Sequence, residues 1–277
     1  MKKDFLKKLF DLTGEVAVVT GGMGQLGRQY VKVLSDVGVK VAIFDITNKV
    51  NSVVAPIIDA GEASLHVVDI TKKDGVRKGF EEVKEKFGVP TILVNNAGID
   101  APPDAPASTT GPFEDFPEEV WDAVIDSHLK GMFFMSQEFI RNIHGAGKEG
   151  SVINVSSTYG VVSPDQAIYE FKRRDGGEFF KPVAYSVAKS GVLNFTRWLA
   201  EYCRVRGVSV RVNTLVPGGV FNNQPQEFVE EYNKRTILGR MARPDEYNAA
   251  ILFLASNKAS SYMTGSTLVI DGGWTAR

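Results

Sequence analysis

The sequence has little that would suit an oxidising compartment or a lipid bilayer. Cys203 is the only cysteine among the 277 residues, so the chain forms no intramolecular disulfide. No apolar run approaches the roughly 18 residues that are needed to cross a bilayer. The basic start, MKKDFLKKLF, contains Asp4, Lys7 and Lys8, which interrupt the hydrophobic stretch that a secretory signal requires. We therefore expect a cytoplasmic protein.

An excess of charge of one sign is also absent. The 32 Lys and Arg residues nearly balance the 33 Asp and Glu residues, which gives a formal net charge of -1. Nucleic acids and anionic membranes attract strongly basic surfaces, so we expect neither as the main partner. We predict no metal site, and the expected partner is a small-molecule substrate.

Short β-branched runs alternate with helical patterns along the chain. Strands are predicted at residues 16–20, 39–44, 64–68, 92–95, 151–155, 208–215 and 267–270. Helices are predicted at residues 25–36, 72–87, 183–206 and 245–255, with a further helix ending near Gly145. Nearly continuous apolar strands between helices indicate a parallel sheet. We predict an α/β fold in which residues 1–277 form a single Rossmann-type doubly wound domain, with about seven parallel strands and helices on both faces.

Two segments do not fit this alternation, residues 100–116 and residues 163–182. Long irregular loops in a compact fold usually carry function or disorder. Both are therefore candidates for the surroundings of a functional site.

A glycine-rich loop, TGGMGQLG at residues 20–27, lies between the first predicted strand and the first predicted helix. Glycine lets a backbone approach a pyrophosphate closely, and a helix N-terminus offers unpaired N–H groups to it. The candidate cofactor-binding residues here are Gly21, Met23, Gly24, Gln25, Leu26 and Gly27. The alternative is a merely tight turn.

Asp45 supports the cofactor interpretation and indicates which cofactor binds. It stands at the end of the second predicted strand, 18 residues after Gly27, where a carboxylate can accept hydrogen bonds from both ribose hydroxyls. A 2′-phosphate would be repelled there, and no Arg or Lys lies within residues 21–27 to attract one. NAD is therefore favoured over NADP.

Tyr185 and Lys189, in the segment YSVAK, lie four residues apart on a predicted helix. This spacing places both side chains on one face. A cation beside a phenol lowers the phenol pKa and makes it a usable general acid or base. The alternative is an ordinary solvated helix face.

Taken together, the motifs resemble those of the short-chain dehydrogenase/reductase family. Besides the glycine-rich loop and YSVAK, the shared features are Asp69, NNAG at residues 95–98, NVSS at residues 154–157, PGGV at residues 217–220 and the ending TGSTLVIDGGW. They run in order over almost the whole chain.

The resemblance implies roles for individual residues. Ser157 would hold the substrate oxygen while Tyr185 exchanges its proton, and Lys189 would bind the nicotinamide ribose and lower the Tyr185 pKa. Asp69 and Ile70 would flank the adenine. The remaining cofactor contacts would come from Asn96, Ala97, Gly98, Pro217, Gly218 and Val220, with Val220 at the carboxamide.

Three features depart from the family pattern. Gln25 stands where shorter-chain members usually carry glycine, so we expect a variant phosphate loop. His128 stands where the family commonly has the Asn that holds a water in the proton relay. It is either a substitute in that relay, titrating near pH 6–7, or a buried packing residue.

The third departure is the length of the chain between Ser157 and Tyr185. Its extra residues, 169–182, include Lys172, Arg173 and Arg174. The insertion at residues 163–182 forms part of the substrate pocket or a subunit contact, and its basic residues would then favour an anionic or phosphorylated substrate. The alternative is a solvated surface excursion. Residues 221–238 are expected to close over the substrate as a lid, and Asn222 would contact the pyrophosphate in place of the usual Thr.

These features predict an NAD-dependent oxidoreductase that interconverts a secondary alcohol and a ketone on a polar sugar-, sugar-acid- or polyol-like substrate. A looser similarity, across SSTYG and PGGVFNNQP, connects the chain with oxidoreductases of bacterial surface-glycan and flagellin modification. The alternatives are a reductase of 3-oxoacyl or other carbonyl substrates, and a non-catalytic NAD-binding sensor or scaffold. Family resemblance further implies a homotetramer or homodimer, with Phe195, Trp198 and Leu199 either at the contact or in the core.

Overall fold

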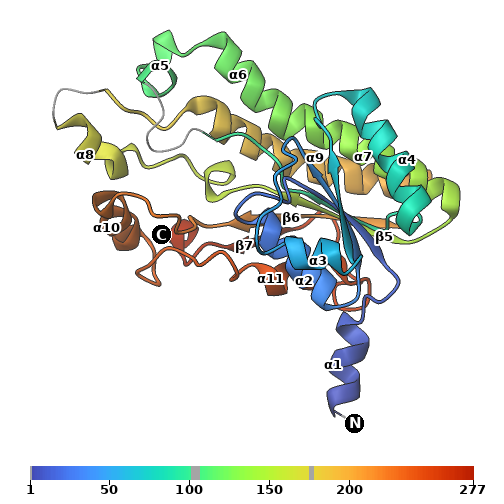
Figure 1. Ribbon diagram of the computed structural model, residues 1–277. Coiled ribbons are helices and arrows are strands. Elements are labelled where there is room, and N and C mark those ends of the chain that lie inside the picture. The colour runs from blue at the N-terminus through green and yellow to red at the C-terminus, as the bar shows by residue number, and fades with distance from the viewer. Residues whose placement is uncertain (1, 101–106, 175–177) are drawn as a thin grey trace.

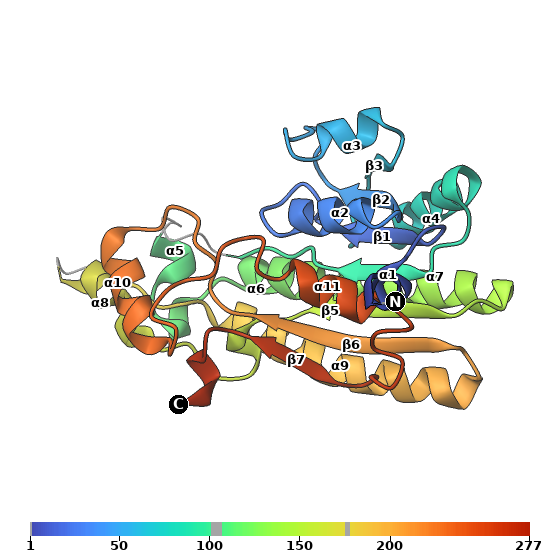
Figure 2. The same ribbon diagram turned by 90° about the horizontal axis from the view of Figure 1, so that it is seen from below.

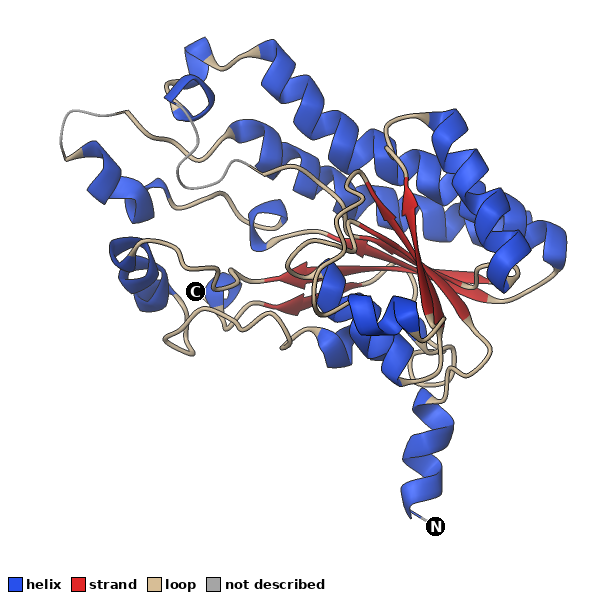
Figure 3. Ribbon diagram, viewed as in Figure 1, coloured by secondary structure: helices blue, strands red, loops and turns tan. Residues whose placement is uncertain are grey.

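The computed structural model describes residues 2–100, 107–174 and 178–277 (Figure 1). Seven parallel strands form one twisted sheet in the order β3-β2-β1-β4-β5-β6-β7 (Figures 2 and 3). The strands are β1 (Val16–Thr20), β2 (Lys40–Asp45), β3 (Ala63–Val67), β4 (Ile92–Asn95), β5 (Gly150–Val155), β6 (Val210–Pro217) and β7 (Thr267–Ile270). Their near-continuous apolar runs suit a sheet that is covered on both faces.

The direction of winding reverses at β1, which pairs with β2 on one side and β4 on the other. The loops after these strands diverge at their carboxyl ends and leave a crevice between them. In doubly wound sheets, ligands bind at this switch point.

Helices cover both faces of the sheet. On one face, α2 (Gly27–Asp36) and α11 (Asn248–Ala255) enclose an aliphatic core around Leu34 and Ile251 (Figure 2). On the other, α4 (Lys73–Phe87), α7 (Gly131–Ala146) and α9 (Val183–Arg206) enclose a second core around Phe80 and Phe139. The predicted layers and the predicted sheet are confirmed.

Several short elements gather beyond the carboxyl ends of the strands (Figures 1 and 2). They are α5 (Ala107–Thr110), η1 (Phe113–Asp115), η3 (Thr158–Gly160), η4 (Gln166–Tyr169), α8 (Glu170–Arg173), α10 (Gln226–Arg235) and η5 (Trp274–Ala276). A separate core joins η3, η4, α8, α10 and η5, and in it Tyr169 and Phe179 pack with Phe228, Tyr232 and Trp274. Ile168, Tyr169, Phe171 and Phe179 anchor the insertion in this core, so the insertion is more than a solvated excursion. Residues 175–177 lie outside the described part.

The sequence patterns missed α1 (Lys2–Phe10), which extends from the body in Figure 1, and α3 (Ala55–Asp59). They also missed an interruption in the helix that ends near Gly145. This helix runs as α6 (Glu118–Ile125), a π-helical turn η2 (Asp126–Lys130) and then α7. Such turns insert an extra residue and often occur at functional sites.

Candidate active site

The glycine-rich loop is held in place by the loop after β4. The Asn96 side-chain amide donates hydrogen bonds to the carbonyl oxygens of Thr20 at 3.0 Å and Gly21 at 3.2 Å. Gly27 begins α2 beneath the loop, where a Cβ atom would lie 2.0 Å from the Gly21 carbonyl oxygen. Only glycine therefore allows α2 to start this close to β1.

A cavity of about 820 Å³ lies over the carboxyl ends of β1, β2 and β4. Of the predicted cofactor residues, it is lined by Gly21, Met23, Gly24, Gln25, Leu26, Asp45, Asp69, Ile70, Asn96, Ala97 and Gly98. The Asp45 carboxylate is fixed by backbone N–H groups of Met23 at 3.0 Å and Thr47 at 3.2 Å. An open cradle of loop backbone with a carboxylate at its far wall fits a nicotinamide dinucleotide.

A second cavity, of about 540 Å³, adjoins the first, because Gln25, Leu26, Asn96 and Gly98 line both. It contains the predicted catalytic residues Ser157, Tyr185, Lys189 and His128, together with Pro217, Gly218, Val220 and Asn222. Gly27 is the one predicted site residue that lines neither cavity. The structure therefore brings the two groups of predicted residues to the same crevice.

Ser157, Tyr185 and Lys189 meet because η3 packs against α9. The Ser156 hydroxyl and the Lys189 ammonium donate hydrogen bonds across this contact, to the carbonyl oxygens of Lys189 at 2.7 Å and Val155 at 2.9 Å. Ser157 and Tyr185 line the same cavity, and the Ser157 hydroxyl acts to lower the Tyr185 pKa. The Lys189 ammonium lies 5.7 Å from the centroid of the Tyr185 ring.

The electrostatics of the triad differ in one respect from the expectation. Burial raises the pKa of Tyr185 above its usual value, and the charge of Asp100 raises it further, against the hydrogen bond with Ser157. Burial lowers the pKa of Lys189 to about 8, against the opposing effect of Asp100. The Tyr185 pKa is therefore raised rather than lowered as expected, because desolvation of the phenol is the largest contribution to its shift.

His128 lies on the π-helical turn against Gly98, where a Cβ atom would come within 2.0 Å of the imidazole. Its Nε2 donates a hydrogen bond of 2.8 Å to the Ile99 carbonyl, and its ring meets the Tyr185 ring edge-on at 5.5 Å. Burial lowers the pKa of His128 to about 3, with help from the positive charge of Lys189. The expected titration near pH 6–7 is therefore wrong, since the imidazole stays neutral over that range.

The insertion contributes a cation to the cavity, but not one of the three that the sequence suggested. Arg173 donates hydrogen bonds to the carbonyl oxygens of Gln166 and Phe179, both at 2.7 Å, and so holds the insertion together. Lys181 lines the cavity instead, with its ammonium 4.8 Å from the Tyr185 ring centroid. Asp100, at the start of the other irregular segment, is its ion-pair partner at 2.5 Å. No sequence pattern distinguishes Lys181 from its basic neighbours.

The segment expected to act as a lid forms part of the cavity wall. Phe228 and Tyr232 of α10 line it, and the Tyr169 ring of the insertion packs against Phe228 at 5.5 Å. Arg235 of α10 forms an ion pair with Asp165 of the insertion. Aromatic residues of the insertion and of α10 therefore make the wall of the cavity together.

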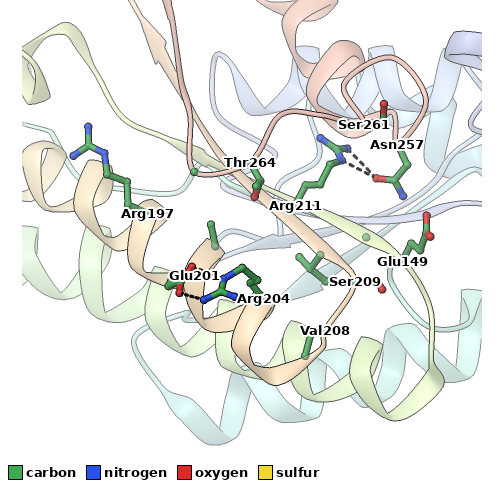
Figure 4. Close-up of a pocket in the computed structure, with 14 residues that line it drawn as sticks. Glu149, Arg197, Glu201, Arg204, Val208, Ser209, Arg211, Asn257, Ser261 and Thr264 are labelled. Carbon is green, nitrogen blue, oxygen red and sulfur yellow. Dashed lines mark hydrogen bonds and ion pairs between the residues drawn. The ribbon is translucent and has the colours of Figure 1, made fainter.

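A third cavity, of about 670 Å³, lies at the opposite end of the sheet, where β5 and β6 begin (Figure 4). Its most buried cation, Arg211, donates hydrogen bonds to Asn257 Oδ1 at 2.9 Å and Ser260 Oγ at 2.8 Å. Arg204 pairs with Glu201 on the same helix. These side chains are occupied by structural contacts, and none of the predicted site residues lines this cavity.

Across the described residues, none of the helices combines the length and the apolar character that a membrane span needs. No group of three or more His, Cys, Asp or Glu side chains in the same residues is arranged to hold a metal ion.

The fold and this site are those of a nicotinamide-dependent oxidoreductase, and the comparison with family models agrees. Residues 15–170 match the family model for short chain dehydrogenases, and residues 176–275 match the model described as enoyl-(acyl carrier protein) reductase. The chain belongs to the short-chain dehydrogenase/reductase family and is an enzyme of that family.

Named relatives span nearly the whole chain. An NAD-dependent glycerol dehydrogenase of Listeria innocua is 32% identical over 98% of this chain and 97% of its own length. A cis-4-hydroxycyclohexanecarboxylate dehydrogenase of Sinomonas cyclohexanicum is 32% identical over 94% of this chain and 96% of its own.

Solved structures show the same fold. A short chain dehydrogenase of Leptospira borgpetersenii with bound NAD⁺ superposes with a TM-score of 0.83 at 31% identity, over 98% of this chain and 95% of that one. A gluconate 5-dehydrogenase of Burkholderia cenocepacia, in complex with NADP and tartrate, gives a TM-score of 0.82 at 26% identity, over 98% and 99%.

Proposed function

We propose that this enzyme is an NAD-dependent dehydrogenase that interconverts a secondary alcohol and a ketone on a polar, hydroxylated substrate. The observation that carries the proposal is the meeting of Ser157, Tyr185 and Lys189 in a cavity that adjoins the dinucleotide cradle. A pure NAD sensor or scaffold has no need of this proton-transfer group.

In this proposal the side chains orient the substrate and move one proton. The Ser157 hydroxyl donates a hydrogen bond to the substrate oxygen, and Tyr185 takes the hydroxyl proton during oxidation or returns it during reduction. Lys189 stabilises the phenolate and binds the nicotinamide ribose. The nicotinamide, when bound, accepts or supplies the hydride.

NAD is the proposed cofactor because of Asp45. Its carboxylate accepts hydrogen bonds from the Met23 and Thr47 N–H groups, and in this proposal it would also accept from the adenosine ribose hydroxyls and repel a 2′-phosphate. The two solved relatives hold NAD⁺ in one case and NADP in the other. The charge at Asp45 is the feature of this chain that favours NAD.

Residues 221–238 are proposed to close over the substrate. They follow β6 directly at the cavity, and α10 closes one side of it. Asn222 would donate its side-chain amide to the pyrophosphate.

We also propose a homo-oligomer in the cytoplasm, built through the face of α7 and α9. Phe195 and Leu199 pack into the core, whereas Trp198 is exposed and stacks on Tyr202 at 5.3 Å. An exposed aromatic pair beside Phe133 is typical of an interface. The buried free thiol of Cys203 suits a reducing compartment.

The test of the enzymatic proposal is NADH formation from NAD⁺, measured at 340 nm against sugars, sugar acids, polyols and their phosphates. Tyr185→Phe should abolish turnover, whereas Tyr202→Phe, on the outer face of α9, should leave it unchanged. Turnover only of 3-oxoacyl thioesters with NADPH would favour the carbonyl-reductase alternative. Proven NAD binding without turnover of either panel would favour the sensor.

A further inference from the structure

Lys181 has an environment that an ordinary surface lysine lacks. Only 8% of its side chain is exposed, and its ammonium lies over the ring of Tyr185 at 4.8 Å from the centroid. Gln166 binds both main-chain polar groups of Lys181: the N–H donates to Oε1 at 2.8 Å, and Nε2 donates to the carbonyl at 3.4 Å. The insertion therefore directs this cation to the catalytic phenol.

The partner of Lys181 is held much less firmly. The Asp100 side chain is 44% exposed, and Lys181 is the one ion-pair partner recorded for it among the described residues. A carboxylate that is nearly half exposed is readily returned to water. An anionic group on a bound substrate can thus replace Asp100 without leaving a buried charge unpaired.

The charges around the cavity favour an anion as well. Among the described residues that line it, the groups charged at neutral pH are Lys181, Lys189 and Asp100, and His128 stays neutral. One positive charge is left over, and oxidised nicotinamide adds another when it is bound. The remaining lining residues are uncharged and include aromatic side chains, such as Tyr169 and Phe228, and polar ones, such as Asn222.

We infer that Lys181 is a specificity-determining residue that binds a carboxylate or phosphate group of the substrate, with Asp100 as its partner when substrate is absent. The substrate class is then a secondary alcohol, or its ketone, that bears an anionic group within reach of both Lys181 and Tyr185. This inference rests on the proposed function for the identity of the reacting group. The binding of an anion by Lys181 can be tested without turnover.

The binding test uses the NADH-loaded protein and calorimetric titration with cyclohexanecarboxylate, inorganic phosphate and, as the neutral match, cyclohexanecarboxamide. A hydrogen-bonded charge pair predicts that an anion binds about 10- to 100-fold more tightly than the amide. Lys181→Met should remove that preference, Lys181→Arg should keep it, and Asp100→Asn should strengthen it. Lys172→Met is the matched control, because Lys172 belongs to the same insertion but lies over the Phe179 ring.

Turnover assays distinguish a substrate phosphate from a substrate carboxylate as the anionic group. They also distinguish failure of the inference about Lys181 from failure of the dehydrogenase proposal. The substrate pairs are glycerol with glycerol phosphate, a hexose with its 6-phosphate, and 4-hydroxycyclohexanecarboxylate with its amide. Turnover of neutral and anionic members with equal kcat/KM would overturn the inference and leave the dehydrogenase proposal standing. Anion selectivity in the binding test without turnover of any substrate would support the inference about Lys181 and overturn the dehydrogenase proposal. A Lys181→Met variant that folds as shown by circular dichroism and keeps the wild-type preference would also overturn it.

Discussion

The side-chain amide of Gln25 donates a hydrogen bond of 2.7 Å to the main-chain carbonyl of Phe221. The first residue belongs to the glycine-rich loop after β1, and the second begins the segment that leads from β6 to α10. Shorter-chain members of the family usually carry glycine at the position of Gln25. A glycine there would not supply a hydrogen-bond donor to the Phe221 carbonyl. Gln25 thus joins the proposed pyrophosphate site to the proposed lid.

The first prediction concerns this link. Gln25→Ala should weaken NADH binding about three- to tenfold, since a net hydrogen bond is worth about 0.5–1.5 kcal/mol. The measurement is a fluorescence titration of NADH, with Gln226→Ala as control because Gln226 bonds to Glu230 on the surface of α10. Equal affinity in the Gln25→Ala variant and the wild type would show that the link does not contribute to cofactor binding.

Asp45 provides the second prediction. Asp45→Asn removes the negative charge that faces the ribose, so the ratio of kcat/KM for NAD to that for NADP should fall by roughly 10- to 100-fold. Asp36→Asn, which affects only a surface pair with Lys32, should leave the ratio unchanged. An unaltered ratio in the Asp45 variant would place cofactor selectivity elsewhere in the loop.

The third prediction concerns stability in acid. The pKa of His128 is lowered from 6.5 to about 3 in the folded protein. As the pH falls below 6.5, the imidazole therefore becomes protonated in the unfolded chain while it stays neutral in the folded one. His128 should therefore cost about 2 kcal/mol of stability at pH 5 relative to pH 7. In urea unfolding, the free energy of unfolding of His128→Asn should therefore fall by about 2 kcal/mol less than that of the wild type between pH 7 and pH 5.

His144→Asn is the control for this measurement, because His144 is exposed near the end of α7. It should follow the wild type at both pH values. The pH profile of kcat/KM should also lack an inflection from His128 between pH 6 and 7. If His128→Asn and the wild type lose equal stability in acid, the imidazole is charged in the folded protein.

Lys189 gives the fourth prediction, in which activity and stability move in opposite directions. Lys189→Met should lower kcat by about 10²- to 10⁴-fold. The Lys189→Met variant should be more stable than the wild type at pH 7. The buried ammonium, whose pKa is lowered from 10.5 to about 8, destabilises the folded wild-type protein. That cost is present below pH 8, is on the order of 3 kcal/mol, and disappears as the pH rises from 8 to 10.5.

Denaturant unfolding of the wild type and Lys189→Met at pH 7 and pH 10 measures the difference. The gain in the variant should shrink at the higher pH, and Lys32→Met, on the surface of α2, should show no such change. A variant that is less stable than the wild type at both pH values would mean that the hydrogen bond from Lys189 to the Val155 carbonyl outweighs the cost of burial.

Local patterns in the sequence predicted most of the frame of the site. Strands such as β1 and β4 are β-branched runs bounded by turn residues, and their limits match the predicted ones. Residue spacing placed Tyr185 and Lys189 on one face of α9, and chain order placed Asp45 at the end of β2. These features depend on neighbours a few residues away, so periodicity and turn chemistry are sufficient to find them.

The tertiary structure decided what depends on distant parts of the chain. The neutral state of His128 follows from burial and from the Ile99 carbonyl, and the position of Gln25 beside Phe221 joins residues 196 apart in sequence. Lys181, rather than its basic neighbours, faces Tyr185 because Gln166 fixes its backbone and Asp100 holds its ammonium. Burial and charge pairing are properties of the packed molecule, so the sequence by itself determined the fold and the candidate reacting groups, while only the folded chain decided their protonation and surroundings.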